Sequence, residues 1–262
     1  KDSNLIADFS INRKESTNTH IFAELDGSIN HNTDYKIQIQ NVTNDNYLKI
    51  HDIKEYTPLV NSDSTLSSYV KLEKDIDNDT NFNSTIKIYE DLSKDDNDKY
   101  QYIFPDFNFS KNINLDEDYN GNFEFLSSGF QKVYETNKYE ALINNDFNYN
   151  SYDFISSYGI KTDYSLLLKN YNTYSENSTI YENKNDHEIF GTILLKSELP
   201  LKKELDKTTN FLKPKMQLRI SPTNGKNISS SNTRIEYDNL FSHNRTGRSD
   251  MVEKGNSLTL GV

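Results

Sequence analysis

The chain has 262 residues, of which 34% are hydrophobic and 26% are charged, and its formal net charge is -11. This acidic balance opposes binding by neutralisation of phosphates, so we expect no nucleic-acid partner. Cys is absent, which excludes disulfides, thiolate metal sites and cysteine nucleophiles. No segment holds the roughly 18 consecutive apolar residues of a membrane-spanning helix, and no export signal follows Lys1.

Apolar and polar residues alternate at every second position in segments spread along the chain. Because successive side chains of a strand point to opposite faces, this alternation predicts half-buried β-strands. In chain order, the predicted strands lie at residues 5–11, 21–29, 35–39, 82–88, 100–104, 123–125, 139–149, 158–168, 212–220 and 258–262. No comparable stretch fits the spacing of an amphipathic helix over three turns, so we predict an all-β fold.

The lengths of the predicted strands and loops narrow the architecture. About a dozen strands, mostly of about 8 to 11 residues, exceed the usual length in soluble sheets and approach the length that crosses a bilayer when tilted. Tight turns are predicted at residues 30–33 and 150–152, and long loops at 43–65, 171–187 and 222–254. This inequality is typical of outer-membrane barrels. We therefore predict an antiparallel up-and-down transmembrane β-barrel, of which residues 1–262 form one part within a single domain.

One predicted strand contains a proline. The alternation changes phase after Pro105, from Tyr102 and Phe104 to Phe107 and Phe109. Because proline cannot donate a ladder hydrogen bond, we predict a bulge or bend there.

One segment resembles half of a calcium-binding loop. Asp116, Asp118, Asn120 and Gly121 follow the D-x-D-x-N-G pattern, but Ser127 stands where the bidentate glutamate belongs. Strand alternation, not helices, flanks the segment. We therefore interpret it as a solvated hairpin turn and predict no metal, and we interpret the acidic runs 75–79 and 91–98 as exposed loops.

No arrangement of residues indicates catalysis. The five histidines are scattered without the spacing of paired metal ligands: His20, His31, His51, His187 and His243. The chain contains neither a G-x-S-x-G elbow nor a glycine-rich phosphate loop. We therefore predict that the protein is not an enzyme and has no cofactor.

Two segments carry motifs beyond the strand alternation. The first is an L-x-P-x-x-Q strand followed by a polar loop, formed by Leu212, Pro214, Gln217, Asp238, Leu240, Phe241, Asn244, Arg245, Gly247, Asp250, Glu253, Gly255 and Asn256. The second follows an alternating strand and contains Asn44, Asp45 and Tyr47. Both motifs resemble the LptD family of lipopolysaccharide-assembly proteins, in which the second has the form V-S-D-x-x-Y-F, and the segment 102–106 matches a strand pattern of that family less specifically. Met251 and Ser257 stand where the family has arginines, so the resemblance implies no pairing of those arginines here.

The resemblance implies an outer-membrane barrel that inserts lipopolysaccharide into the outer leaflet. It also implies a plug lipoprotein like LptE, and a periplasmic bridge like LptA that is reached through an N-terminal jellyroll domain. In the predicted strand 212–220, Leu212, Met216, Leu218 and Ile220 would face lipid, and Lys213, Lys215, Gln217 and Arg219 would face a wet lumen. We expect the chain to be an interior slice of the barrel, outside the family's lateral gate.

Two alternatives stay open at this point. A mean hydropathy of -0.85 and a high content of Tyr and Asn are also compatible with a soluble secreted β-sandwich or solenoid that binds glycans or surfaces. Another outer-membrane barrel, such as a porin or receptor, shares the fold without the loop motif at 238–256. The direction in which the apolar stripe points discriminates the soluble alternative from the two membrane proteins.

Overall fold

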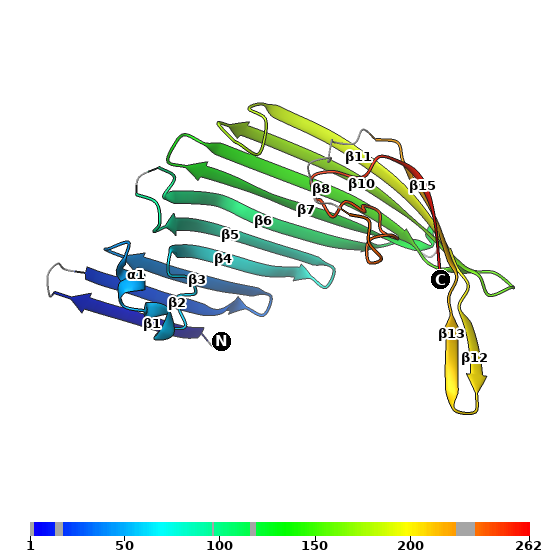
Figure 1. Ribbon diagram of the computed structural model, residues 1–262, viewed down its shortest axis with the longest axis horizontal. Coiled ribbons are helices and arrows are strands. Elements are labelled where there is room, and N and C mark those ends of the chain that lie inside the picture. The colour runs from blue at the N-terminus through cyan, green and yellow to red at the C-terminus, as the bar shows by residue number, and fades with distance from the viewer. Residues whose placement is uncertain (1–2, 14–17, 96, 116–118, 224–233) are drawn as a thin grey trace. The chain divides into compact units, whose positions relative to one another are not determined.

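The computed structural model describes residues 3–13, 18–95, 97–115, 119–223 and 234–262. One 13-stranded sheet dominates, and its strands follow chain order from β1 to β8, then β10, β11, β14 and β15 (Figure 1). The first half of the sheet comprises β1 (Ser3–Asn12), β2 (Asn18–Asn30), β3 (Thr33–Val42), β4 (Thr65–Asp77), β5 (Thr80–Asp91) and β6 (Tyr100–Asn114). The second half comprises β7 (Gly121–Tyr134), β8 (Tyr139–Ser151), β10 (Lys161–Glu176), β11 (Asn185–Glu198), β14 (Lys215–Ser221) and β15 (Gly255–Gly261).

Three short strands complete the β structure. The two-residue strand β9 (Phe154–Ile155) pairs with β10 at the margin of the sheet. The strands β12 (Leu201–Leu205) and β13 (Thr208–Leu212) form a separate hairpin, drawn in yellow in Figure 1. Every pair whose register is described is antiparallel, for example β1 with β2, from Ser3 opposite Gly27 to Asn12 opposite Asn18. The predicted all-β class and up-and-down order are therefore confirmed.

Several predicted boundaries were wrong. The strand predicted at 158–168 begins at Lys161 and continues to Glu176, so the loop predicted at 171–187 shrinks to residues 177–184. Asn170 and Asn172 occupy alternate positions there, which removes the apolar stripe although the backbone remains paired. The strand predicted at 212–220 is divided between β13 and β14, because Pro214 has no backbone N–H for a ladder.

Other elements were missed, and one expectation stays a prediction. The strands β4 and β11 gave no clear alternation, since lysines, serines and acidic residues interrupt both. The turn at residues 31–32 and the loop at 43–64 agree with the predictions, as do the described parts of the loop predicted at 222–254, residues 222–223 and 234–254. β6 runs through Pro105 without a break, with a cis peptide bond between Phe104 and Pro105. The register across this position is not described, so the bulge stays a prediction.

The chain divides into two compact units, which we describe separately. Unit 1 comprises residues 1–110, 128–143 and 172–186, and unit 2 comprises residues 111–127, 144–171 and 187–262. In each unit the sheet has one face rich in apolar side chains and one rich in polar side chains, hereafter the apolar face and the polar face.

The strand β10 shows the contrast between the faces in unit 2. Leu166 and Leu168 are 40% and 49% exposed, whereas the intervening Ser165 and Lys169 are 3% and 5% exposed. Other exposed side chains of the apolar face are Ile193, Leu195, Met216, Leu218, Leu258 and Leu260, and buried ones of the polar face are Thr192, Gln217, Arg219 and Thr259. A soluble sheet buries its apolar side chains and exposes its charges. In unit 2 the apolar side chains are exposed and the charged side chains Lys169 and Arg219 are buried, which is the reverse arrangement.

Unit 1 repeats the inversion at its exposed surface. Its apolar face exposes Leu5, Phe9, Ile21, Ile39, Val70 and Ile86. Its polar face holds buried His20 and Gln40, which lie under the segment 43–64. Apolar side chains that are individually exposed are ordinary, but a continuous face of them marks a surface that contacts an apolar phase or a partner.

The segment 43–64 carries the two helices and a small core. Helix α1 (Tyr47–Ile50) and the 3-10 helix η1 (Ile53–Glu55) contribute Tyr47, Leu48 and Ile53 to it. The buried apolar cluster consists of Phe22, Val42, Tyr47, Leu48, Ile53, Leu59, Val60, Leu66 and Leu92. This loop is therefore fixed by hydrophobic contacts rather than only by its ends.

Replacement of Leu48 tests this anchoring. Leu48 is 0% exposed, so Leu48→Ala is expected to destabilise the segment by about 2–5 kcal/mol through lost burial and a residual cavity. Limited proteolysis within 43–64 measures the effect. Ile50→Ala in the same helix is the control, because Ile50 is 67% exposed and its truncation should change stability by less than about 0.5 kcal/mol. Equal protease sensitivity of the two variants would contradict the role of the core.

Candidate functional site

The polar face of unit 2 carries charges that are paired across neighbouring strands. Lys169 of β10 donates to Asp146 of β8 at 2.8 Å and to the side-chain carbonyl of Asn144 at 3.1 Å. Further along β8, Asn148 donates to Glu124 of β7 at 3.1 Å. A buried charge without a partner costs several kcal/mol, so this pairing is what allows Lys169 to lie at 5% exposure.

A loop covers part of the same face. Arg219 of β14 donates from Nη1 to the backbone carbonyl of Glu253 at 2.6 Å, and its Nη2 lies 3.3 Å from the Glu253 carboxylate. Arg245 donates two hydrogen bonds to that carboxylate, from Nε to Oε2 at 2.7 Å and from Nη2 to Oε1. Arg219 is 1% exposed, so the loop shields its guanidinium from solvent. Two arginines thus share one carboxylate and fasten the loop to the sheet.

The ionisation of Glu253 depends on these arginines. Burial alone would raise the pKa of this carboxyl, but the hydrogen bond from Arg245 and the charges of Arg219 and Arg245 outweigh it. The pKa of Glu253 therefore lies below its ordinary value, and the hydrogen bond to Glu253 raises the pKa of Arg245. The carboxylate stays charged over the physiological range.

The loop is internally ordered by Asn244. Its side-chain amide donates to the carbonyls of Arg248 and Met251 at 2.6 and 2.7 Å, and its Oδ1 accepts from Thr246. Gly247 has a φ of +66°, a conformation that L side chains rarely adopt, which permits the tight reversal. Met251 and the adjacent Val252 are buried, so the loop packs down rather than projecting into solvent.

A histidine makes a second attachment of the loop. His243 lies 2.9 Å from the Ser165 hydroxyl of β10, measured from its Nε2. Burial lowers the pKa of His243 to about 4, and the positive charges of Lys196 and Arg219 act in the same direction. The imidazole is therefore neutral in the folded loop.

Unit 1 holds a comparable set of loop contacts. Lys99 donates to both carboxylate oxygens of Asp45 at 2.8 Å and lies 3.4 Å from Glu90. Thr136 donates through its backbone N–H to Asp98 at 3.2 Å. These contacts connect the loops 43–64, 92–99 and 135–138 at one end of the strands.

The structure separates the motif residues into several places. In unit 1, Asp45 pairs with Lys99, Tyr47 lies 3.2 Å from His20 through its hydroxyl, and Asn44 accepts a bond from the backbone of Asn46. In unit 2, Leu212 ends β13 with an exposed side chain and Pro214 follows it outside a strand, whereas Gln217 is buried in β14. The L-x-P-x-x-Q motif therefore spans a hairpin and the following strand.

The loop residues of the motif differ in what they contact. Asn244, Arg245 and Glu253 form the network that holds the loop to the sheet, and Asp250 pairs with Arg248. Phe241 packs against Gly261, where a Cβ would lie 2.9 Å from the ring. The remaining members have these positions: Asp238 is exposed, Leu240 is half-buried, Gly247 has a left-handed φ, Gly255 opens β15 with a φ of +100°, and Asn256 lies opposite Ile220.

Sequence patterns did not reveal several charged and polar pairs of the polar face. Lys169, Asp146 and Ser165 looked like ordinary polar positions of strands, and His243 was one of five scattered histidines. The sequence did contain one signal for these residues, their position in the alternation. Each of the strand residues is adjacent in sequence to an apolar residue that is exposed in the fold, so it must point to the opposite face. The assignment of Met216 and Leu218 to one face and Gln217 and Arg219 to the other agrees with the structure, where only the first pair is exposed.

Within the described ranges, no three His, Asp or Glu side chains are grouped so that they could hold a metal ion. The predicted turn at Asp116 and Asp118 lies outside the described residues. Among the helices that the structure describes, none has the length and apolar character needed to cross a membrane.

A long antiparallel sheet that exposes an apolar face and buries paired charges defines a β-barrel protein of the outer-membrane class. The family model described as LptD, LPS transport system D, matches residues 17–262. The chain therefore belongs to the LptD family, whose function is lipopolysaccharide transport at the outer membrane, and the predicted resemblance is confirmed. A search of curated proteins gave no match.

The shared carboxylate gives a first prediction for this site. Glu253→Gln leaves Arg219 buried beside a neutral amide, which should cost about 3–5 kcal/mol and release the loop 234–254. Hydrogen exchange of the loop measures the release. Asp250→Asn is the matched control, because its partner Arg248 is largely exposed and exposed pairs contribute about 0–1 kcal/mol. Equal exchange in both variants would remove Glu253 as the fastening group.

The neutral histidine gives a second prediction, on pH. The pKa of His243 is lowered from 6.5 to about 4, so the unfolded loop binds more protons than the folded loop between these values. The contribution of His243 to the stability of the loop attachment should therefore fall as pH decreases from about 6.5 to about 4. Hydrogen exchange across this range measures it. The variant His243→Asn should lose the dependence between pH 6.5 and about 4.5, above the range in which the Glu253 carboxyl takes up protons. An unchanged pH profile in the variant would refute the assignment.

Proposed function

We propose that the protein is the barrel component of a translocon that inserts lipopolysaccharide into the outer leaflet of the outer membrane. The observation that carries the proposal is the inversion of the sheet, with apolar side chains exposed and paired charges buried on opposite faces. Combined with membership of the LptD family, this supports a lipid-facing exterior and a polar interior for passage of sugar and phosphate.

The same reasoning extends to the domain and its partners. Residues 1–262 form part of a single barrel domain in this proposal. The polar face and its fastened loop would contact the transported glycolipid or a plug lipoprotein like LptE. A periplasmic bridge like LptA would deliver the glycolipid through an N-terminal domain. The side chains of the site position and pair charges, and none of them is assigned a role in bond making, so the proposed activity is transport without catalysis.

The arrangement of the faces argues against a soluble β-sandwich that binds glycans. Such a protein would bury the stripe that contains Leu166, Leu168 and Leu218, and these side chains are instead 37–49% exposed. A porin or receptor would share the faces, but the family match favours lipopolysaccharide transport.

Depletion in the native cell tests the proposed function. Loss of the protein should lower newly made lipopolysaccharide that an impermeant probe can reach at the cell surface, while total lipopolysaccharide is maintained. Complementation with Leu168→Arg should fail, since a charge on the lipid-facing side costs about 2–4 kcal/mol at mid-membrane. Tyr158→Arg is the control, because Tyr158 lies outside the strands and is 86% exposed. Normal surface delivery after depletion would overturn the proposal.

A further inference from the structure

The ladder between β3 and β4 in unit 1 stops before the strands end. The last paired residues are Gln38 and Tyr69, although β3 continues to Val42 and β4 begins at Thr65. Past this point, Ser68 replaces a backbone partner: its hydroxyl accepts from the Gln40 N–H at 3.0 Å and donates to the Gln40 carbonyl at 3.2 Å. The two strands are therefore held apart by a side chain.

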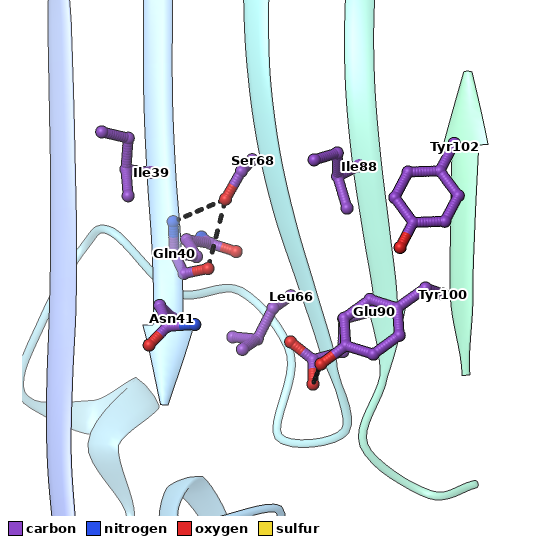
Figure 2. Close-up of a pocket in the computed structure, with 9 residues that line it drawn as sticks. All are labelled: Ile39, Gln40, Asn41, Leu66, Ser68, Ile88, Glu90, Tyr100 and Tyr102. Carbon is purple, nitrogen blue, oxygen red and sulfur yellow. Dashed lines mark hydrogen bonds between the residues drawn. The ribbon is translucent and has the colours of Figure 1, made fainter. Parts of the chain in front are cut away.

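A pocket of about 320 Å³ lies at this separation. Figure 2 shows Ser68 between the strands, bonded to Gln40, with the other lining residues around it. The lining consists of Ile39, Gln40, Asn41, Leu66, Ser68, Ile88, Glu90, Tyr100 and Tyr102. Cross-strand pairing places Leu66 opposite Glu90 and Ser68 opposite Ile88. Since residues directly opposite in a ladder share a face, Ser68 belongs with Ile88 to the apolar face, whereas Leu66 also packs in the buried cluster of the segment 43–64.

Several polar groups of the pocket already have protein partners. The Gln40 side chain accepts from the Ser67 N–H at 2.7 Å and donates to the Leu59 carbonyl. The Glu90 carboxylate accepts from the Tyr100 hydroxyl at 2.8 Å and lies 3.4 Å from the Lys99 ammonium. A polar ligand would have to break these bonds to be recognised by Gln40 or Glu90, whereas an apolar one would not.

The isoleucines and the leucine of the lining form an apolar wall, and polar side chains lie toward the strand ends. Ile39 and Ile88 are 49% and 39% exposed at the mouth, and Leu66 is buried behind them. Asn41, Glu90 and Tyr100 lie toward the strand ends, where Figure 2 shows them nearest the connecting loops. Tyr100, Tyr102 and Phe104 stack in succession with centroids 6.4 Å apart. Aromatic side chains of this kind gather where hydrocarbon meets water in membrane barrels.

We propose that this pocket binds one acyl chain of a membrane lipid, whose headgroup lies at the strand ends near Asn41 and Tyr100. The inference rests on the proposed function, because it requires the apolar face to contact the bilayer. The occupant follows from the satisfied polar floor and the half-exposed isoleucines, which together leave an apolar surface open toward the bilayer. The side-chain bridge at Ser68 leaves the space that a continuous ladder would close.

Photo-crosslinking in lipid nanodiscs tests the pocket. The probe is a phosphatidylcholine with a diazirine on one acyl chain, and labelled peptides are mapped by mass spectrometry. We expect labelling at Leu66 and Ile88 several-fold above that at Val70 and Ile86, which lie on the same face outside the pocket. Uniform labelling of the face, or labelling that spares the pocket because it is closed or holds a protein segment, would overturn the inference.

Matched variants sharpen the result. Ile88→Trp should fill the pocket and reduce labelling at Leu66 several-fold, whereas Ile86→Trp should leave it unchanged, since Ile86 is on the same strand and face but lines no part of the pocket. Ile39→Trp gives a second filled variant if the first does not fold. Equal labelling at Leu66 in the filled and control variants would also overturn the inference. Absence of labelling on the whole apolar face would instead refute the proposed function, so the two failures are distinguishable.

Discussion

The requirement that every buried charge has a partner governs this protein. A sheet whose covered face is polar cannot be stabilised by hydrophobic burial there, and an unpaired ammonium or guanidinium would cost several kcal/mol. Lys169 satisfies the requirement between neighbouring strands, and Arg219 satisfies it through a loop residue, Glu253. The position of the loop 234–254 therefore follows from the charge on β14 as much as from the loop's own sequence.

The loops of the two units are attached to the sheet by different kinds of contact. In unit 2, the loop attaches by ion pairs and by a neutral histidine, and only Met251 and Val252 add deep apolar burial. In unit 1, the segment 43–64 attaches mainly by an apolar cluster around Leu48, and the Lys99 and Asp45 pair supports it at the rim. An electrostatic attachment responds to pH and a hydrophobic one does not. The attachment of the unit 2 loop is therefore the one that depends on pH.

The interruption of the β3–β4 ladder shows how side chains can replace part of the regular pairing of a barrel strand. The Ser68 hydroxyl bonds to the N–H and the carbonyl of Gln40, and the Gln40 side chain bonds to the Ser67 N–H. The strand ends can therefore separate while these three backbone groups keep hydrogen-bond partners. The pocket depends on the side chains of Ser68 and Gln40 that bridge the gap.

The sequence by itself determined the fold class and the sides of the sheet. Alternation is a local property with a period of two, so it marked most strands and assigned Met216 and Gln217 to opposite faces. The chain's anchors at Asn44 to Tyr47 and at Asp238 to Asn256 also indicated the family, which the family match then showed. Strands without an apolar stripe, such as β4 and the end of β10, escaped this reasoning because backbone pairing alone defines them.

Only the tertiary structure decided which polar residues meet. Arg219 and Glu253, or Ser165 and His243, are far apart in the chain, and nothing in their local sequence sets their separation in space. It also decided that Pro214 ends one hairpin before another strand begins, and that β3 and β4 separate at Gln40. Pairing across strands depends on register and on the path of each loop, and these are set by the fold as a whole.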